Sequence, residues 1–363
     1  MRLTARVTRF SLTVIAGLFC AAVGPQETAG FEVPKLVVAH PSESLAFLPF
    51  YVAREKQFFD KAGVSVDLIT VGASNFYPAL FSGQTDAVHS NLSMPMTLRQ
   101  RGQTVTTIGA FGMNFQTQFV ISKKLAESAG INANTPLSDK LKVLKGKTIA
   151  VTGQGAGTDQ QLRFLLSKAG LDYQKDVNVT FIPEGSTDLI ALANRKIDGF
   201  IHNAPWYQIS IARGDAVMFV DFGSGQVAEA NGYMQNVITT TPKVIASKRE
   251  ALVKMLTGLT WAMRYIHQPE NLAEVVRIAQ KNVGGNKTSQ GTNPADMQGY
   301  ITKLIANNQI PASPVLDAKN FSISQNFDNY LRKIQKLPEL TYSYAQMVDA
   351  SLADQAVRAA NAK

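Results

Sequence analysis

Cysteine is almost absent from this chain of 363 residues, which contains only Cys20. Cys20 lies in an N-terminal segment that we expect to be removed, and Phe19 before it is too large for the small residue that lipoprotein processing requires. A mature chain without this thiol would have no disulfide, no thiolate zinc site and no cysteine nucleophile. Long hydrophobic runs are lacking as well, because no apolar run after the N-terminus is long enough to span a membrane.

The N-terminal segment has the pattern of a secretory signal peptide. Arg2, Arg6 and Arg9 precede an apolar run over residues 10–23, which is too short to span a bilayer and is followed by small and polar residues. We therefore predict that residues 1–30 are a signal peptide that is cleaved off. The sequence thus predicts an exported protein.

A strong excess of charge is also missing. The chain has 36 Lys and Arg against 27 Asp and Glu, a net charge of +9, and removal of the first 30 residues lowers it to +7 by taking away three arginines and one glutamate. The basic residues are scattered and lack the interleaving with aromatics that binding to a nucleic-acid backbone requires. We expect no nucleic-acid partner, whereas a general attraction for small anions stays open.

What the sequence does contain is an internal repeat, over residues 74–87 and 186–199. Each copy has a serine, an Ala-Leu pair five residues later, and then an aspartate, Asp86 or Asp198, followed by a small residue. We expect each serine to cap a helix whose Ala-Leu pair packs inward, and each aspartate to open a buried strand. An apolar strand and a helix ending in Lys-Ala-Gly precede both copies, so each half of the chain reads β-α-β-α-β.

Two such halves predict an α/β protein of two lobes, each a mostly parallel sheet with flanking helices, and a ligand between the lobes. We expect lobe one to comprise residues 31–115 and 239–363, with mainly helices in the C-terminal third, and lobe two to comprise residues 116–238. Extended segments near residues 104–121 and 233–240 would carry the chain from one lobe to the other. The predicted strands lie near residues 35–39, 64–71, 86–90, 147–152, 178–182 and 198–202, and predicted helices cover residues 158–168 and 187–195.

The loops at the carboxyl ends of the strands form the predicted binding site, because open α/β sheets bind ligands there. These loops carry hydroxyls, amides, imidazoles and aromatic rings, but no Arg or Lys that could clamp a phosphate or a dicarboxylate. A neutral or singly charged organic ligand fits them better, with its flat body on aromatic rings and its polar end on helix N-terminal amides. For Phe47, Phe76 and Trp206, packing within a lobe is an equal alternative. The candidate ligand-binding residues are His40, Ser42, Ser44, Phe47, Phe76, Ser90, Asn91, Phe111, Asn114, Gly155, Gly157, Thr158, His202, Asn203, Trp206 and Gln235.

Three glycines lie in the loop over residues 153–157, between a predicted strand and a predicted helix. Their spacing is not the G-x-G-x-x-G of dinucleotide sites, and Glu184 lies too far along the chain for the acidic residue of that fingerprint. We expect these glycines either to let backbone N–H groups of residues 155–158 approach a ligand or to shape a turn. Asp159 is expected to cap the following helix and to disfavour a strongly anionic ligand.

Three of the four histidines, His40, His89 and His202, stand at predicted strand ends. Three imidazoles can hold a zinc ion, so a metal site is one alternative. Hydrogen bonding to an organic ligand is favoured over it, because no cysteine is available and the nearest carboxylates, Glu43 and Asp86, have other roles. Packing of the histidines is the third alternative, and we expect no cofactor.

Four segments, over residues 49–59, 79–87, 144–151 and 197–200, together carry a resemblance to a known family. They resemble the periplasmic solute-binding proteins of nitrate, sulfonate, taurine and thiamine-pyrimidine importers. The resemblance implies the type II periplasmic-binding-protein fold, closure of two lobes on a small solute, and delivery to an ABC transporter permease in the inner membrane. We expect the protein to act as a monomer.

The resemblance also reaches a fungal thiamine-pyrimidine synthase that works with pyridoxal phosphate. That enzyme needs an active lysine and a cysteine-rich motif, and the predicted binding loops contain neither; no Ser-His-Asp order and no paired catalytic carboxylates can be placed. We therefore expect binding without catalysis, with a ligand-carrying sensor for a membrane receptor as the alternative to import. The favoured solute is a small aromatic or heterocyclic compound or a monocarboxylate, and an alkylsulfonate or taurine-like solute is second.

Overall fold

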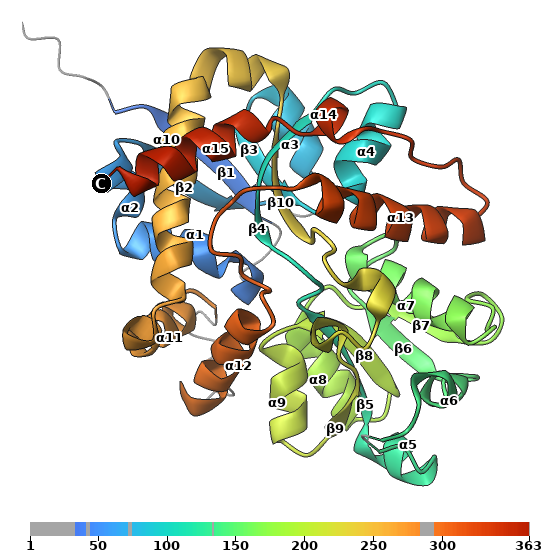
Figure 1. Cartoon of the computed structure of the whole chain (residues 1–363). Helices are drawn as coiled ribbons and strands as arrows, with labels where there is room; N and C mark the ends of the chain where they lie inside the picture. Colours follow the sequence, from blue (N-terminus) through green and yellow to red (C-terminus); the bar gives the residue numbers. More distant parts are fainter. Residues whose placement is uncertain (1–32, 41–43, 72–74, 133, 284–293, 363) are drawn as a thin grey trace, which may run out of the picture. The chain divides into compact units, whose positions relative to one another are not determined.

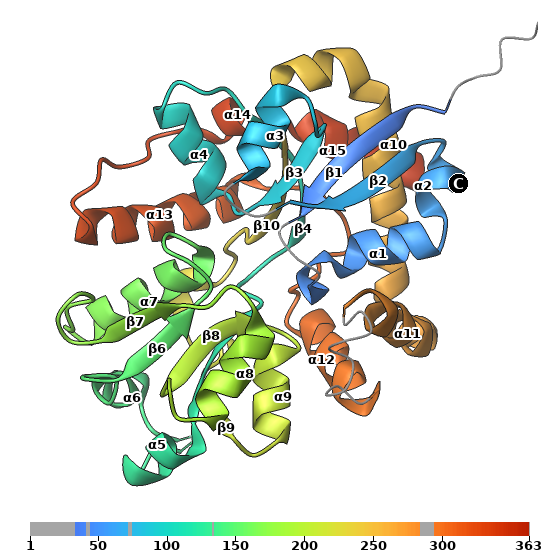
Figure 2. The ribbon, with the colours of Figure 1, turned by 180° about the vertical axis from the view of Figure 1, so that it is seen from behind.

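The structure is a computed structural model that describes residues 33–40, 44–71, 75–132, 134–283 and 294–362 (Figures 1 and 2). In these residues ten strands form two sheets of five strands each. Helices flank both sheets, and the C-terminal part of the chain is helical. None of the helices in the described part of the chain has the length and apolar character needed to cross a bilayer.

The first sheet has the strand order β2-β1-β3-β10-β4. Strand β1 pairs in parallel with β2 and β3, whereas β10 runs antiparallel to both of its neighbours. The five strands are β1 (Lys35–His40), β2 (Ser65–Thr70), β3 (Ala87–Ser90), β4 (Thr106–Gly112) and β10 (Asn236–Thr240).

The second sheet repeats this plan with the order β7-β6-β8-β5-β9, and β5 is its antiparallel strand. The chain crosses from the first sheet to the second between β4 and β5, and returns with β10. The predicted two-sheet α/β fold is therefore confirmed, although the sequence pattern did not predict β9. The strands are β5 (Thr117–Ser122), β6 (Thr148–Val151), β7 (Asn178–Phe181), β8 (Gly199–Asn203) and β9 (Ala216–Val220).

Because β10 belongs to the first sheet from Asn236 onward, the change of sheet falls close to the predicted return of the chain. The assignment of residues 116–238 to lobe two stays a prediction. We use "lobe one" for the first sheet with its helices and "lobe two" for the second sheet with its helices.

Four helices flank the first sheet and five belong to lobe two. Those of lobe one are α1 (Leu48–Glu55), α2 (Phe58–Ala62), α3 (Phe76–Ser82) and α4 (Ser93–Gln100). Those of lobe two are α5 (Lys123–Ser128), α6 (Leu137–Lys142), α7 (Gly157–Lys168), α8 (Gly185–Ala193) and α9 (Trp206–Ala212).

The C-terminal helices pack on both lobes. The longest, α10, lies beside α1, α2 and α15 (Figure 1) and has a kink at Lys248, where φ is −129° and ψ is 24°. On lobe two, Tyr300 of α12 contacts Tyr207 of α9 and Phe327 of α13 contacts Phe164 of α7, with ring centroids 6.1 and 4.8 Å apart. The helices are α10 (Pro242–Ile266), α11 (Leu272–Asn282), α12 (Pro294–Ala306), α13 (Ala318–Ile334), α14 (Tyr344–Met347) and α15 (Ala350–Asn361).

The repeat is visible in the hydrogen bonds that its two aspartates accept. Oδ2 of Asp86 accepts from the backbone N–H of Val37 at 2.9 Å, and Oδ2 of Asp198 accepts from that of Thr148 at the same distance. Each aspartate thus ties the start of one strand, β3 or β8, to the neighbouring strand, β1 or β6. The prediction that these aspartates open buried strands is confirmed.

The predicted serine cap is wrong in the second copy. The N-cap of α8 is Glu184, and Ser186 is the second residue of the helix, because the backbone turns helical at Gly185. The carbonyl of Glu184 already accepts from the N–H of Thr187 at 2.9 Å. Ser74 of the first copy lies outside the described residues. Leu80 and Leu192 of the two Ala-Leu pairs are buried, as predicted.

Candidate functional site

At the carboxyl edge of the first sheet, the predicted residues His40, Phe47 and Phe111 form one stack of rings. The ring of Phe47 lies between those of His40 and Phe50, with centroids 4.6 and 4.4 Å away, and Phe111 meets it edge-on at 5.5 Å. Phe47 and Phe111 are fully buried, and His40 is nearly so. All three rings are engaged in packing in this structure, which was the alternative to ligand contact for His40 and Phe47.

Two other predicted residues of lobe one are also occupied by packing. Phe76 is buried in a cluster with residues such as Leu80, and Oγ of Ser90 accepts from the hydroxyl of Tyr77 at 2.9 Å. Asn91 is half-buried, and its Oδ1 accepts from the N–H of Met94 at 3.2 Å. Asn91 therefore shapes the start of α4 and still presents part of its amide to the surface.

His89 of β3 ends a chain of side-chain amides that assigns its tautomer. Nε2 of Gln116 donates to the carbonyl of Gln309 at 2.9 Å, so Oε1 of Gln116 accepts from Nδ2 of Asn236 at 3.2 Å. The remaining Oδ1 of Asn236 lies 2.8 Å from Nε2 of His89 and must accept its proton. Nδ1 of His89 is then an acceptor, and it is buried without a hydrogen-bond partner among the described residues.

Burial holds His89 in this neutral form, because it lowers the pKa of His89 to about 4. The nearby His40 lowers the pKa further, whereas the hydrogen bond that His89 donates to Asn236 raises it. Gly112 of β4 allows the close approach of Asn236, because a Cβ at this position would lie 2.1 Å from the Nδ2 atom of Asn236. The sequence placed Gln116 and Asn236 at the crossovers beside the candidate site, but neither was among the candidate ligand-binding residues.

The predicted residues Asn114 and Gln235 lie on the two crossovers and connect them. Oδ1 of Asn114 accepts from the N–H of Gly232 at 2.6 Å, and its Nδ2 donates to the carbonyl of Asn307 at 3.2 Å. Oε1 of Gln235 accepts from the backbone N–H of Gln116. Both amides therefore hold the crossovers together in this structure.

In lobe two, the glycine loop after β6 leads into α7, which begins at Gly157 with Ala156 as its N-cap. The space next to Gly155 and Gly157 is open, since an added Cβ would meet no atom within 4 Å. Thr158 is buried, and its Oγ1 accepts from the N–H of Thr152 at 3.0 Å. The first N–H groups of α7 have no acceptor within the helix and point toward this open loop.

Asp159 does not act as the predicted cap. It is the third residue of α7, fully buried, and its Oδ2 accepts from the N–H of Gly155 at 2.8 Å and from Nε of Arg163 at 3.0 Å. Its charge is therefore compensated by Arg163, and the N–H of Gly155 is already used. The contribution of the N–H groups of residues 155–158 to ligand binding stays a prediction.

His202 and Trp206 lie together after β8. Nδ1 of His202 accepts from the N–H of Asn203 at 2.8 Å, so its Nε2 carries the proton and faces the carbonyl of Pro183 at 3.4 Å. Burial lowers the pKa of His202 to about 4. The half-buried Trp206 lies edge-on to His202 at 6.3 Å and packs on Gly185, where a Cβ would lie 2.2 Å from the indole ring.

One hydrogen bond joins predicted residues from the two lobes. Nδ2 of Asn203, at the end of β8, donates at 3.3 Å to Oγ of Ser44, which also accepts from the N–H of Ala46 at 3.1 Å. Oδ1 of Asn203 is buried and has no hydrogen-bond partner in the described part of the chain. Ser42, which was predicted beside Ser44, lies outside the described residues.

The first turn of α8 holds a site residue that the sequence analysis missed. Asp188 is 1% exposed, its Oδ1 has no hydrogen-bond partner among the described residues, and burial raises its pKa to about 8. It follows Gly185 by three positions, which places both on one face of the helix, the face that Trp206 covers. The repeat contained a signal, because an aspartate replaces Phe76 at the corresponding position.

The three histidines do not form a metal site in this structure. Within residues 33–40, 44–71, 75–132, 134–283 and 294–362, no three His, Cys, Asp or Glu side chains are grouped so that they could hold a metal ion. Both ring nitrogens of His202 are engaged by protein atoms, which leaves none for a metal. The zinc alternative is therefore not supported.

Comparison with known proteins gives a family and a fold. The model of the NMT1-like family matches residues 43–280, and a search of curated proteins finds no match. Among solved structures, the chain resembles the alkanesulfonate-binding protein SsuA from Xanthomonas axonopodis pv. citri bound to MOPS (TM-score 0.65, 15% identity, covering 87% of this chain and 98% of that chain).

Two further structures resemble the chain at a similar level. The ligand-binding component of an ABC-type import system from Staphylococcus aureus, with zinc bound, has a TM-score of 0.67 and 11% identity and covers 89% of this chain and 99% of that chain. The periplasmic nitrate-binding protein NrtA from Synechocystis PCC 6803 has a TM-score of 0.57 and 14% identity and covers 86% and 92%. These likenesses show the periplasmic-binding-protein fold, and the match over residues 43–280 shows that the chain belongs to the NMT1-like family of substrate-binding proteins.

Proposed function

We propose that this protein is the periplasmic substrate-binding component of an ABC importer, which closes its two lobes on a small organic solute and delivers it to an inner-membrane permease. The observation that carries the proposal is the hydrogen bond between Ser44 and Asn203, two strand-end residues from different sheets. A contact of this kind lets one bound molecule reach both lobes at once. The family match supports the same role.

The solute is proposed to be a heterocyclic or aromatic compound that carries N–H donors. Three buried acceptors at the strand ends and the following helix have no hydrogen-bond partner among the described residues: Oδ1 of Asp188, Oδ1 of Asn203 and Nδ1 of His89. Buried acceptors are costly when unpaired, so a donor on the ligand would gain from meeting them. Sulfonate, nitrate and carboxylate oxygens only accept, so a solute without an N–H donor, such as an alkylsulfonate, is placed second.

The ring of Trp206 provides a flat apolar surface at Gly185, three residues before Asp188. It is half-buried at the start of α9, against Gly185 and edge-on to His202, whereas Phe47 and Phe111 are enclosed by their neighbours. An aromatic ligand could stack on such a ring while its N–H groups reach Asn203 or Asp188. Asn91 and the open loop at Gly155 and Gly157 complete the proposed site.

The test is isothermal titration of the purified mature chain with aminopyrimidines, aromatic monocarboxylates, alkylsulfonates, taurine and nitrate. We expect binding of a donor-bearing heterocycle, a rise in its melting temperature, and loss of affinity of about tenfold or more in Trp206→Ala and Asn203→Ala. The matched control is Asn178→Ala, which removes an exposed amide at the amino end of β7. Unchanged affinity in both site variants would move the binding site elsewhere.

Import and sensing are separated by a second measurement. Uptake of the labelled solute by cells with and without this chain should differ if the protein serves an importer. A protein that binds the solute tightly but leaves uptake unchanged would instead be a ligand-carrying sensor. Binding of alkylsulfonates alone would reject the donor-bearing ligand and keep the receptor role.

A further inference from the structure

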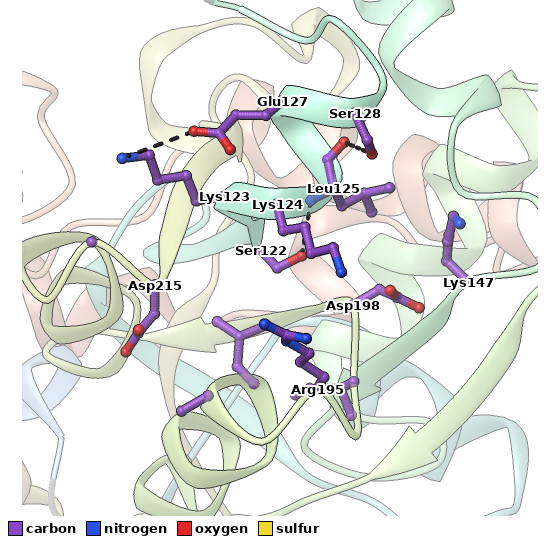
Figure 3. Close-up of a pocket in the computed structure, with 14 residues that line it drawn as sticks. Ser122, Lys123, Lys124, Leu125, Glu127, Ser128, Lys147, Arg195, Asp198 and Asp215 are labelled. Carbon is purple, nitrogen blue, oxygen red and sulfur yellow. Dashed lines mark hydrogen bonds and ion pairs between the residues drawn. The ribbon is translucent and has the colours of Figure 1, made fainter.

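Lobe two has a pocket of about 620 Å³ at the edge of its sheet opposite to the proposed ligand site. The pocket is lined at the amino ends of β6, β8 and β9, where Lys147, Asp198 and Asp215 lie, and by α5 with Lys123 and Lys124 (Figure 3). Proposed ligand residues such as Asn203 lie at the carboxyl ends of these parallel strands. The two sites are therefore on different edges of one sheet, and the pocket is separate from the proposed ligand site.

Three cationic side chains surround this pocket without an ion pair. Lys124, Lys147 and Arg195 line it, and no carboxylate lies within salt-bridge distance of any of them in the described residues. Figure 3 shows the end of Lys124 above Arg195, with Lys147 to one side. Cations brought together without a counter-charge repel one another, so an anion between them would be stabilised.

The acidic residues at the pocket either have a partner already or lie away from the three cations. Glu127 pairs with Lys123 at 3.9 Å, and Oδ2 of Asp198 accepts from the N–H of Thr148 at 2.9 Å. Asp215 lies on the opposite side of the pocket from Lys147 in Figure 3. The part of the pocket between Lys124, Lys147 and Arg195 thus contains Asp198 as its single carboxylate and keeps a positive excess.

Comparison with lobe one shows that the arginine is not required by the backbone. Arg195 has φ of 57°, and the corresponding residue of the first copy is Gly83, with φ of 80°. The N–H groups of both residues close the same turn, onto the carbonyls of Leu192 and Leu80. Glycine adopts this conformation without strain and arginine does not, so Arg195 departs from the residue that the backbone favours.

At the corresponding edge of lobe one, the aspartate of the repeat is neutralised by an ion pair. There, Lys248 of α10 lies 2.7 Å from Oδ1 of Asp86, the counterpart of Asp198. In lobe two, Asp198 lines the pocket beside α5 and forms no ion pair with any described residue. The same sheet edge is thus covered and neutralised in one lobe, and open and cationic in the other.

We propose that the pocket formed by Lys124, Lys147 and Arg195 binds a phosphate group, either of a free phosphate compound or of an anionic lipid head group. A phosphate supplies the negative counter-charge that the three cations lack. The guanidinium of Arg195 can donate two parallel hydrogen bonds to it. The proposal rests on this pocket alone and does not depend on the solute of the opposite edge.

The test is titration of the full mature chain with inorganic pyrophosphate at low ionic strength. We expect saturable binding that weakens as salt is added, because the attraction is between exposed charges. Arg195→Gly, which installs the residue of lobe one, should weaken binding by about tenfold or more without lowering the melting temperature. Lys196→Gln is the matched control, since it removes an exposed positive charge next in the sequence that does not line the pocket.

A second experiment separates the two sources of the phosphate. Flotation with vesicles containing phosphatidylglycerol, compared with vesicles of phosphatidylcholine alone, measures binding to a lipid head group. Flotation that Arg195→Gly abolishes and Lys196→Gln preserves would assign the lipid, whereas pyrophosphate binding without flotation would assign a soluble compound. Equal losses in Arg195→Gly and Lys196→Gln, or no binding of either probe to the unaltered protein, would overturn the proposal.

Discussion

The two copies of the internal repeat, in lobe one and lobe two, have the same backbone plan. They differ at two corresponding positions and in the ion pair of one conserved aspartate. Asp86 and Asp198 are alike, since each accepts a hydrogen bond from a neighbouring strand at 2.9 Å. Phe76 of lobe one is replaced by Asp188 in lobe two, and Gly83 is replaced by Arg195. The third difference is Lys248, which pairs with Asp86, while Asp198 has no such partner among the described residues.

This comparison separates what the fold needs from what it leaves free. A carboxylate that satisfies a backbone N–H at the start of a buried strand is retained in both lobes, because that donor would otherwise be unpaired. At the other two positions, stability would favour an apolar side chain in the core and a glycine at positive φ. Lobe two instead has Asp188 and Arg195 there. Both departures lie in lobe two, beside the proposed ligand site and the phosphate pocket.

The largest expected effect comes from the position of Phe76 and Asp188. Burial raises the pKa of Asp188 to about 8, so between pH 4 and pH 8 the folded protein holds a proton that the unfolded chain releases. Folding stability then falls as pH rises through this range, by about 1.4 kcal/mol per pH unit at most. Asp188→Asn should therefore gain up to about 4 kcal/mol relative to the unaltered protein between pH 5 and pH 8.

Urea unfolding of both proteins at pH 5 and pH 8 measures this gain. Asp328 of α13, whose pKa burial raises to about 8, contributes equally to both proteins and cancels in the difference. Phe76→Leu is the control in lobe one, and its loss of stability should be the same at both pH values. A pH-independent difference for Asp188→Asn would show that Asp188 is ionised in the folded protein.

The second effect concerns the two aspartates. Asp86→Ala should cost about 2–3 kcal/mol, because it removes the acceptor of Val37 and leaves Lys248 unpaired, with a discount because Lys248 is partly exposed. Asp198→Ala removes only the acceptor of Thr148 and should cost about 1–2 kcal/mol. The free energies of unfolding of the two variants, measured in urea at one pH, compare these two costs. Equal costs would mean that the ion pair with Lys248 adds no stability.

The smallest effect tests the backbone at Gly83 and Arg195. Gly83→Ala should lower stability by about 1 kcal/mol from conformation alone, since a Cβ there would meet no atom within 4 Å. Arg195→Gly should leave stability unchanged or raise it by up to about 1 kcal/mol. Melting temperatures of the two variants should move in these directions. A clear loss of stability in Arg195→Gly would mean that the arginine serves folding.

The architecture could be predicted well from the sequence, because hydrophobic period and helix-ending glycines are local signals. The strands β1, β2, β3, β6, β7 and β8 lie where apolar runs predicted them, and Gly63 and Gly170 end helices at positive φ. The serine cap at Ser186 was wrong, because the backbone turns helical at Gly185, before the side chain that could have capped it. The strand β9 was missed, although it is a short apolar run.

The candidate site could be predicted as a set of loops but not residue by residue. Ser44 and Asn203 do meet, as residues at strand ends should, whereas Phe47 and Phe111 turn toward each other and become buried. No local pattern distinguishes a ring that lines a site from one that fills a core. The hydrogen bonds of Asn236 to His89 and Gln116 were not predicted, because these partners are distant in sequence.

The sequence by itself determined the two α/β halves, the crossovers between them and the carboxylates that open the inner strands, because each depends on neighbours within a strand, a turn or a helix. Only the tertiary structure decided which polar groups are used up and which remain unpaired. Asp159 meets Arg163 and is neutralised, whereas Oδ1 of Asp188 is buried without a partner among the described residues. Lys248 pairs with Asp86, while Asp198 has no ion pair among the described residues. Such outcomes depend on which distant segments fold against a residue, and no spacing along the chain specifies that.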